Sequence, residues 1–173
     1  MADIMSICRE HTTLTAMQQE LLKRMLVVFP FLADLAHAHV RLYLVRSDKK
    51  SFVIAAEHWP HTVYLTPEEP SIGDVVRMIE EPLLCRAMQT GRFSQGKREW
   101  NYGSMIDMMA EPVYDSNTIL GIVCFETTSE NRAMEGYSRL LDASRLLLKS
   151  ARRQLEPAMY QHLSASDGII ITD

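Results

Sequence analysis

The sequence predicts an α+β domain in α/β/α layers, with a central antiparallel sheet flanked by N- and C-terminal helices. Two apolar β-runs meet at the turn Asp115-Ser116-Asn117, with Pro112 before the turn and Gly121 after it. A shorter pair of strand-like runs precedes them, and amphipathic helical stripes stand towards both ends of the chain. Runs joined by short turns pair antiparallel, and the terminal helices supply the covering layers.

An amphipathic helix is predicted near the N-terminus. Thr15 and Gln18 have the spacing of a capping box. The apolar residues that follow at helical spacing are Met17, Leu21, Leu22, Met25 and Val28. Pro30 lacks the amide that bonds back four residues, so the helix kinks or restarts there and residues 31–38 form a second helical piece.

Two strands are then expected as an antiparallel hairpin. Residues 40–46 alternate apolar with cationic or aromatic side chains, residues 47–50 form a turn, and residues 52–57 return as the second strand. We expect this hairpin at the edge of the sheet or next to it.

The middle of the chain has a different character. Residues 58–71 contain three prolines, which prevent long regular structure, although residues 62–65 suit a short strand. Short helices are predicted at 73–79 and 82–89, the second with Pro82 in its first turn and Gly91 just past its end. Residues 92–103 are polar and aromatic with little periodicity, so we expect a connection that wraps over another part of the fold.

The central hairpin spans Met105 to Thr128. Its second run, residues 118–128, is β-branched and aromatic with two apolar faces, so this strand should be covered on both sides. Residues 130–155 form the longest helix, apolar on one side and cationic on the other, and Pro157 stops it. The terminal helices pack on their own sheet or form a bundle, within one chain or across a two-fold dimer axis.

Composition narrows the class of protein. A chain of 173 residues buries roughly 70% of its unfolded surface, enough for one domain with flanking helices. The 18 basic and 22 acidic residues are well mixed and give a net charge of −4, so neither nucleic acid nor a membrane surface is an expected partner. Three cysteines without a CxxC pair, no signal peptide and no apolar run of ~20 residues predict a cytoplasmic protein with reduced thiols.

Signatures of enzymes and metal sites are absent from the sequence. There is no Walker loop, GxGxxG, HExxH or GxSxG motif. His58 and His61 are separated by a proline that breaks helix geometry, and no third ligand is near. His37 and His39 point in different directions. We therefore predict binding rather than catalysis, with no metal and no cofactor.

The central hairpin carries a resemblance to a known family. Ala110-Glu111-Pro112-Val113, the turn at 115–117 and Ile119-Leu120-Gly121-Ile122-Val123 match the proline and glycine hairpin of GAF domains, the small-molecule sensor modules of signalling proteins. Further motifs are similar to the N-terminal GAF-type sensor domain of a group of bacterial two-component sensor histidine kinases, as in ethanolamine-sensing and mycobacterial systems. These motifs are Glu10-His11-Thr12, residues 32–36, Arg46-Ser47-Asp48, Pro60-His61-Thr62, Pro82-Leu83 and Thr90-Gly91.

The resemblance implies a cytoplasmic GAF-like sensor domain in residues 1–156, which binds a small molecule and transmits the change through its C-terminal helix. Residues 157–173 look like a linker and the opening strand of a PAS domain, which follows the sensor in this group. The implied partners are a ligand such as a nucleotide or metabolite, a second copy in a homodimer, downstream PAS and kinase domains, and a response regulator. The chain lacks a phosphoacceptor histidine box and an ATP-binding region, so kinase activity is not expected in it.

The ligand pocket is predicted between the central sheet and the crossover from His58 to Gly103, because that segment combines irregular backbone with aromatic and polar side chains. The candidate ligand-binding residues are Tyr43, Glu57, His58, Tyr64, Arg77, Met78, Met88, Tyr102 and Glu111. Arginines and lysines between residues 77 and 98 suit an anionic ligand, but acidic neighbours interleave with them, so a solvated mixed surface is an equal interpretation.

Two other functions stay open. In the first alternative, the domain is a ligand-free dimerisation module that positions the kinase, and side chains fill its cavity. Alternatively, it resembles the GAF proteins that reduce methionine sulfoxide with pocket cysteines, because Cys85 lies on a predicted pocket helix beside Arg86, which would lower the thiol pKa. A reductase also needs a resolving thiol, and Cys124 in a central strand is better explained as core.

Overall fold

A six-stranded antiparallel sheet organises the fold. The computed structural model describes residues 3–61, 71–101, 104–133 and 135–152. The strands lie in the order β3-β2-β1-β6-β5-β4. Their bounds are β1 His39–Val45, β2 Ser51–His58, β3 Val75–Arg77, β4 Ser94–Asn101, β5 Ser104–Asp115 and β6 Thr118–Thr128. The predicted α+β layers are therefore present.

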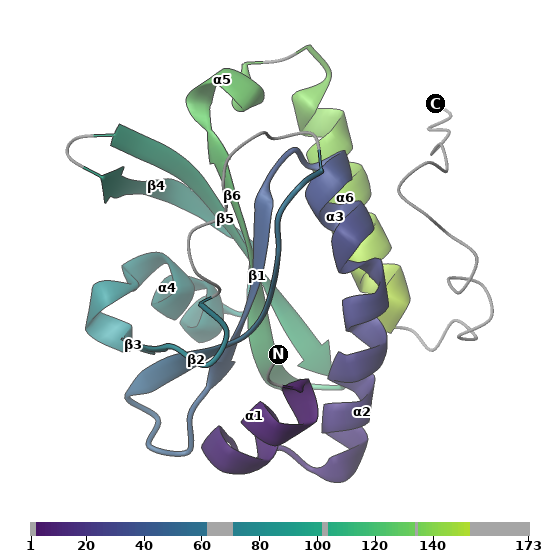
Figure 1. Ribbon diagram of the computed structural model, residues 1–173, viewed down its shortest axis with the longest axis vertical. Helices are drawn as coiled ribbons and strands as arrows, with labels where there is room; N and C mark the ends of the chain where they lie inside the picture. The colour runs from purple at the N-terminus through teal and green to yellow at the C-terminus, as the bar shows by residue number, and fades with distance from the viewer. Residues whose placement is uncertain (1–2, 62–70, 102–103, 134, 153–173) are drawn as a thin grey trace.

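The helices divide between the two faces of the sheet (Figure 1). One face, called here the helical face, is covered by α1 (Ile4–His11), α2 (Ala16–Met25), the 3-10 turn η1 (Leu26–Val28), α3 (Phe29–Leu35) and α6 (Tyr137–Arg152). The other, called here the crossover face, is covered by α4 (Pro82–Thr90) and the 3-10 turn η2 (Met78–Glu80). A short helix, α5 (Ser129–Arg132), follows β6.

The N-terminal signals act as predicted. The Gln18 amide donates to the Thr15 hydroxyl over 3.3 Å, and the Thr15 amide donates to the Gln18 side chain over 3.0 Å, which completes the capping box of α2. Pro30 lies in the first turn of α3, where its missing amide costs no helical hydrogen bond. The chain thus restarts at the proline rather than continuing one helix.

The predicted central hairpin is confirmed as β5 and β6, and both faces of β6 are buried. Val123 and Phe125 enter the core of the helical face, while Ile122 and Cys124 enter the core of the crossover face. Gly121 lies against β1: a Cβ there would stand 2.6 Å from the carbonyl oxygen of Tyr43. Only glycine allows the two central strands this approach.

Two predictions for the middle of the chain are wrong. Residues 73–79, expected as a helix, contain the edge strand β3, because Val75 and Val76 pair with the open edge of β2. Residues 92–103, expected as an irregular connection, contain β4, which pairs along β5 from Ser94. In both cases an unpaired neighbouring strand supplies backbone partners that the local sequence does not reveal. The strand suggested for residues 62–65 lies outside the described residues.

The predicted C-terminal helix is divided. It starts as α5, and α6 begins only at Tyr137, after Gly136 in the left-handed region at φ 78°. The expected end at residue 155 and the PAS-like segment 157–173 lie outside the described residues. Within the described part of the chain, no helix is both long and apolar enough to cross a bilayer.

Candidate functional site

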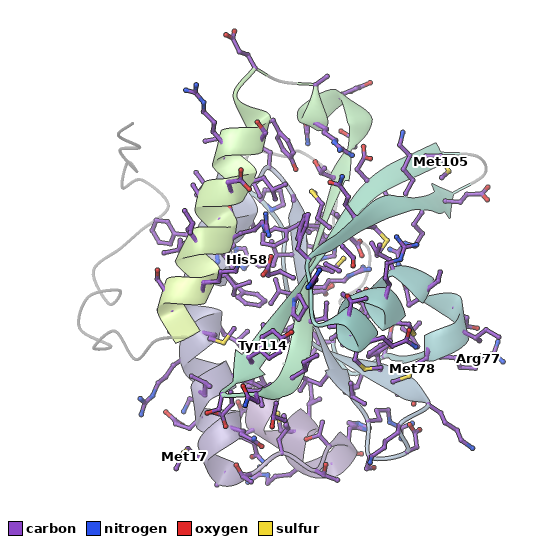
Figure 2. The ribbon with its side chains drawn as sticks, turned by 180° about the vertical axis from the view of Figure 1, so that it is seen from behind. Met17, His58, Arg77, Met78, Met105 and Tyr114 are labelled. Carbon is purple, nitrogen blue, oxygen red and sulfur yellow. The ribbon has the colours of Figure 1, made fainter. Side chains whose placement is uncertain are left out.

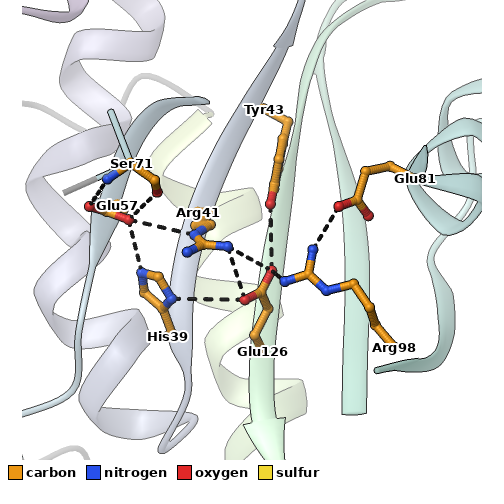
Figure 3. Close-up of polar contacts among 8 residues, drawn as sticks. All are labelled: His39, Arg41, Tyr43, Glu57, Ser71, Glu81, Arg98 and Glu126. Atoms are coloured by element: carbon orange, nitrogen blue, oxygen red, sulfur yellow. Dashed lines mark hydrogen bonds and ion pairs between the residues drawn. The ribbon is translucent and has the colours of Figure 1, made fainter. Parts of the chain in front are cut away.

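Charged side chains gather on the crossover face where the apolar core of that face ends (Figure 3). Because alternate residues of a strand share a face, His39, Arg41 and Tyr43 of β1 point the same way. Side chains from β2, β4, β6 and the start of α4 join them. We call this group the ionic cluster; its members are His39, Arg41, Tyr43, Glu57, Ser71, Glu81, Arg98 and Glu126.

Glu126 is the centre of the ionic cluster. Its side chain is only 2% exposed, and two guanidinium groups share it: Arg41 Nη1 lies 3.3 Å from Oε2 and Arg98 Nη2 lies 3.1 Å from Oε1. The Tyr43 hydroxyl donates to Oε1 over 3.5 Å. Arg98 also binds the buried Glu81, with Nη1 2.6 Å from Oε1. Arg98 therefore connects the edge strand β4 both to the central strand β6 and to the start of α4.

His39 is buried between two carboxylates without a good hydrogen bond. Its Nε2 lies 3.3 Å from Glu57 and its Nδ1 lies 3.8 Å from Glu126, yet neither nitrogen has a hydrogen-bond partner among the described residues. The ring stacks on Trp59 with 3.7 Å between centroids. Burial, followed by the charges of Arg41 and Arg98, lowers the pKa of His39 to about 3. The imidazole is neutral at pH 7 and can both donate and accept.

The remaining carboxyl groups complete the wall of the ionic cluster. Glu57 accepts from the Ser71 amide over 2.9 Å and from the Ser71 hydroxyl over 2.7 Å, and Arg41 Nε lies 3.5 Å away. Burial raises the pKa of Glu81, against the attraction of Arg98. Three carboxyl groups, whose side chains are at most 8% exposed, thus face two guanidinium groups.

The ionic cluster has features that can hold a polar ligand. It offers paired charges, a neutral imidazole and an apolar floor formed by residues that include Phe52, Ile54 and Ile122. Burial raises the pKa of both nearby thiols, Cys85 and Cys124, so neither is an activated nucleophile. In the part of the chain that the structure describes, no group of three or more His, Cys, Asp or Glu side chains is arranged to hold a metal ion.

Of the residues predicted to bind a ligand, the structure places Tyr43 and Glu57 together in the ionic cluster. His58 lines a cavity on the helical face instead. Arg77 is exposed on the far side of the molecule from His58 (Figure 2) and binds Glu80, with Nη2 2.5 Å from Oε1. Glu111 lies under α6 on the helical face.

The other predicted residues are also apart from the ionic cluster. Met78 and Met88 pack at the edge of the crossover-face core and line a separate cavity of about 370 Å³ with Arg46. Tyr64 and Tyr102 lie outside the described residues. The predicted pocket residues are therefore dispersed over several parts of the fold.

Several members of the ionic cluster were not among the predicted site residues: His39, Arg41, Ser71, Glu81, Arg98 and Glu126. The sequence contains one indication of this cluster. Every second residue of the strand, His39, Arg41 and Tyr43, is ionisable or aromatic, while the residues between them are apolar. Glu126 gives a second signal, since it follows an otherwise apolar run. No signal indicates that Arg98 reaches these strands, because its own strand was not expected.

A family model described as "Histidine kinase PdtaS, GAF domain" matches residues 4–141. No curated protein matches the chain. A solved structure described as the sensor region of a sensor histidine kinase is 19% identical with a TM-score of 0.65; the match covers 96% of this chain and 57% of the other. This chain therefore spans little more than half the length of that relative.

Transcriptional regulators of the IclR family have a similar fold. One from Brucella abortus is 14% identical with a TM-score of 0.52, covering 79% of this chain and 65% of its own. An IclR homolog from Microbacterium hydrocarbonoxydans, complexed with 4-hydroxybenzoate, is 10% identical with a TM-score of 0.54. The match covers 81% of this chain and 71% of that homolog. At these identities the likeness concerns the fold alone.

Proposed function

The chain belongs to the family of GAF domains of the histidine kinase PdtaS, and from this premise we propose that it senses a small polar molecule at the ionic cluster. The predicted resemblance to GAF domains of sensor histidine kinases is confirmed by the family match over residues 4–141. The ligand, the site and the transmission of the signal are the proposal.

The observation that supports this proposal most is the burial of charge without full hydrogen bonding. Removing charges from water costs several kcal/mol each, and well-packed apolar residues would serve stability as well or better. Here His39 has two nitrogens and Arg41 has one, Nε, that lack hydrogen-bond partners among the described residues. Buried polar atoms normally have partners, so these atoms are suited to a ligand. An IclR homolog with a similar fold is complexed with 4-hydroxybenzoate, which is consistent with a small-molecule role for the present chain.

The proposed output is the helix α6. Glu111 on β5 is buried and holds α6 through Arg145, with Nε 2.7 Å away, and through Lys149, with Nζ 3.2 Å away. β5 pairs directly with β6, the strand that carries Glu126. A ligand that rearranges the ion pairs of Glu126 would favour one packing of α6, provided that it binds the two packings unequally.

We also propose that this chain has no catalytic activity of its own, works in the cytoplasm and acts through downstream PAS and kinase domains and a response regulator. The three cysteines are free, which supports a reducing compartment. The raised thiol pKa values argue against a methionine sulfoxide reductase.

A thermal-shift screen of small metabolites and nucleotides tests the ligand site. We expect a binder to raise Tm in the wild-type protein and in Arg77→Ala, whose side chain is exposed and remote, but not in Glu126→Gln. If no compound stabilises the protein, or if a compound stabilises Glu126→Gln equally, the ionic cluster is not the sensing site.

A ligand-free dimerisation module is the second candidate, favoured by one observation on α6. Leu146 is 65% exposed, and Leu140 and Ala143 beside it are only half-buried, at the spacing of a helical contact stripe. Sedimentation velocity of wild-type protein and Leu146→Glu tests it: a dimer that Leu146→Glu dissociates, together with no binder in the screen, favours this function.

A further inference from the structure

We propose a second ligand site on the helical face, in which a cavity between strand β2 and the N-terminal helices binds a small acid with an apolar body. The cavity has a volume of about 590 Å³. Ligand pockets of proteins usually enclose about 300 to 1,000 Å³. It is separated from the ionic cluster by the sheet itself, so this site goes beyond the proposed sensing site.

A β-bulge in β2 creates the space. Leu42 of β1 pairs with Ala56, but the next residue, Tyr43, pairs with Ile54, which leaves Ala55 as the extra residue. Consequently two consecutive alanines, Ala55 and Ala56, both contribute to the core of the helical face. Their small side chains leave a hollow in the sheet surface that the helices do not fill. Apolar residues complete the wall of this cavity: Ile4, Leu26, Val27, Phe29, Pro30 and Ile72.

Two of the side chains that line the cavity, His58 and Lys23, are polar and can contribute to ligand binding. The Nε2 atom of His58 is buried and has no hydrogen-bond partner among the described residues. Burial, together with His61, lowers the pKa of His58, so its ring is neutral at pH 7 and offers one hydrogen bond. Lys23 also lines the cavity, and no ion pair of Lys23 is found within the described ranges.

The acidic groups at the cavity do not oppose an anion strongly. Glu57 directs its carboxylate to Ser71 and to Arg41 in the ionic cluster. Asp3 is the N-cap residue of α1; its side chain makes no capping hydrogen bond, and the partial positive charge of the helix end offsets part of its negative charge. Lys23 carries the positive charge at the cavity, and this charge favours a carboxylate or sulfonate head over a cationic one.

The position of His58 connects this cavity to the ionic cluster. Its chain neighbour Trp59 stacks on His39, on the other face of the sheet. A ligand that fixes His58 would also restrict Trp59 and so stabilise the stacked His39. We therefore expect a ligand in the cavity to change the ionic cluster through His58 and Trp59.

The test measures the fluorescence of anilinonaphthalene sulfonate, an aromatic acid, added to the whole chain, with octanoate as competitor. We expect saturable binding of one probe per chain that octanoate displaces. Ala56→Leu fills the cavity and should abolish binding. Lys23→Glu should weaken it by ~10-fold through the reversed charge. The matched control Arg24→Glu makes the same charge change on the neighbouring residue, which does not line the cavity, and should change affinity less than ~2-fold.

Two results would overturn the proposal. One is probe binding that does not saturate or that octanoate does not displace. The other is equal weakening by Lys23→Glu and Arg24→Glu. Circular dichroism checks each variant for folding, and the pair Lys23→Glu and Arg24→Glu decides the question even when Ala56→Leu does not fold, because both residues are exposed.

Discussion

The two faces of the sheet bury side chains from the same strands but use different chemistry. On the helical face, β1 contributes Leu42 to an apolar core that the N-terminal helices and α6 close. On the crossover face, the same strand contributes His39 and Arg41 to the ionic cluster, which stands beside a smaller apolar core. Apolar packing stabilises without directional demands, whereas buried charge requires matched partners. We therefore expect the helical face to contribute most of the stability, whereas the proposed ligand specificity belongs to the crossover face.

The largest effect is expected on the helical face. Leu42 is fully buried, so Leu42→Ala should lower the free energy of unfolding by about 3 kcal/mol through lost transfer energy and a residual cavity. Urea denaturation measures this change. A loss below about 1 kcal/mol would mean that the neighbouring side chains close over the space left by Leu42, which the close packing around this fully buried side chain argues against.

A smaller but clear loss is expected in the ionic cluster. Glu126→Gln leaves Arg41 and Arg98 without their shared anion. Their side chains are 16% and 29% exposed, so water solvates the two guanidinium groups in part. The free energy of unfolding should therefore fall by about 2 kcal/mol. The same denaturation experiment measures it. Arg77→Ala is the control: this exposed residue should give an unchanged midpoint. Equal stability of Glu126→Gln and wild-type protein would show that the ion pairs contribute nothing net.

The pH dependence of stability comes next in size. The pKa of His39 is lower in the folded protein than the ordinary value near 6.5, so the unfolded chain binds more protons and stability falls as the pH falls. From about pH 7 to about pH 5.5 the loss from this residue should be about 1 kcal/mol. His39→Gln should remove that part of the slope. If stability instead rises as the pH falls over this range, Glu57 and Glu126 hold the imidazole of His39 protonated.

The smallest effect concerns the contact between α6 and the sheet. Arg145 binds the buried Glu111 and lies over the Phe93 ring at 3.8 Å, but Lys149 still neutralises Glu111 in its absence. Arg145→Ala should therefore cost about 0.5 to 1 kcal/mol and increase amide hydrogen exchange in α6. Arg139→Ala, an exposed change on the same helix, should leave exchange unchanged. Equal amide hydrogen exchange of α6 in both variants would show that Arg145 does not hold this helix on the sheet.

Much of the fold is predictable because local signals and the tertiary contacts agree. The capping box at Thr15, the proline at the start of α3 and the two-sided apolar run of β6 all correspond to observed elements. The edge strands β3 and β4 were missed because edge positions are selected by an unpaired neighbour more than by their own residues. Of the ionic cluster, only Tyr43 and Glu57 were among the predicted ligand-binding residues, because the members of the cluster lie far apart in sequence.

The sequence by itself determined the class of the domain and its central hairpin, because periodicity, caps and turn residues act over a few neighbouring positions. Its relation to GAF sensors came from the resemblance of its motifs to that family. Only the tertiary structure decided which face each polar residue occupies. The bulge at Ala55 separates Glu57 on the crossover face from the alanines that open the cavity beside His58, and the pairing of β4 brings Arg98 to Glu126. Register and strand order place these groups, and both depend on pairing between distant segments.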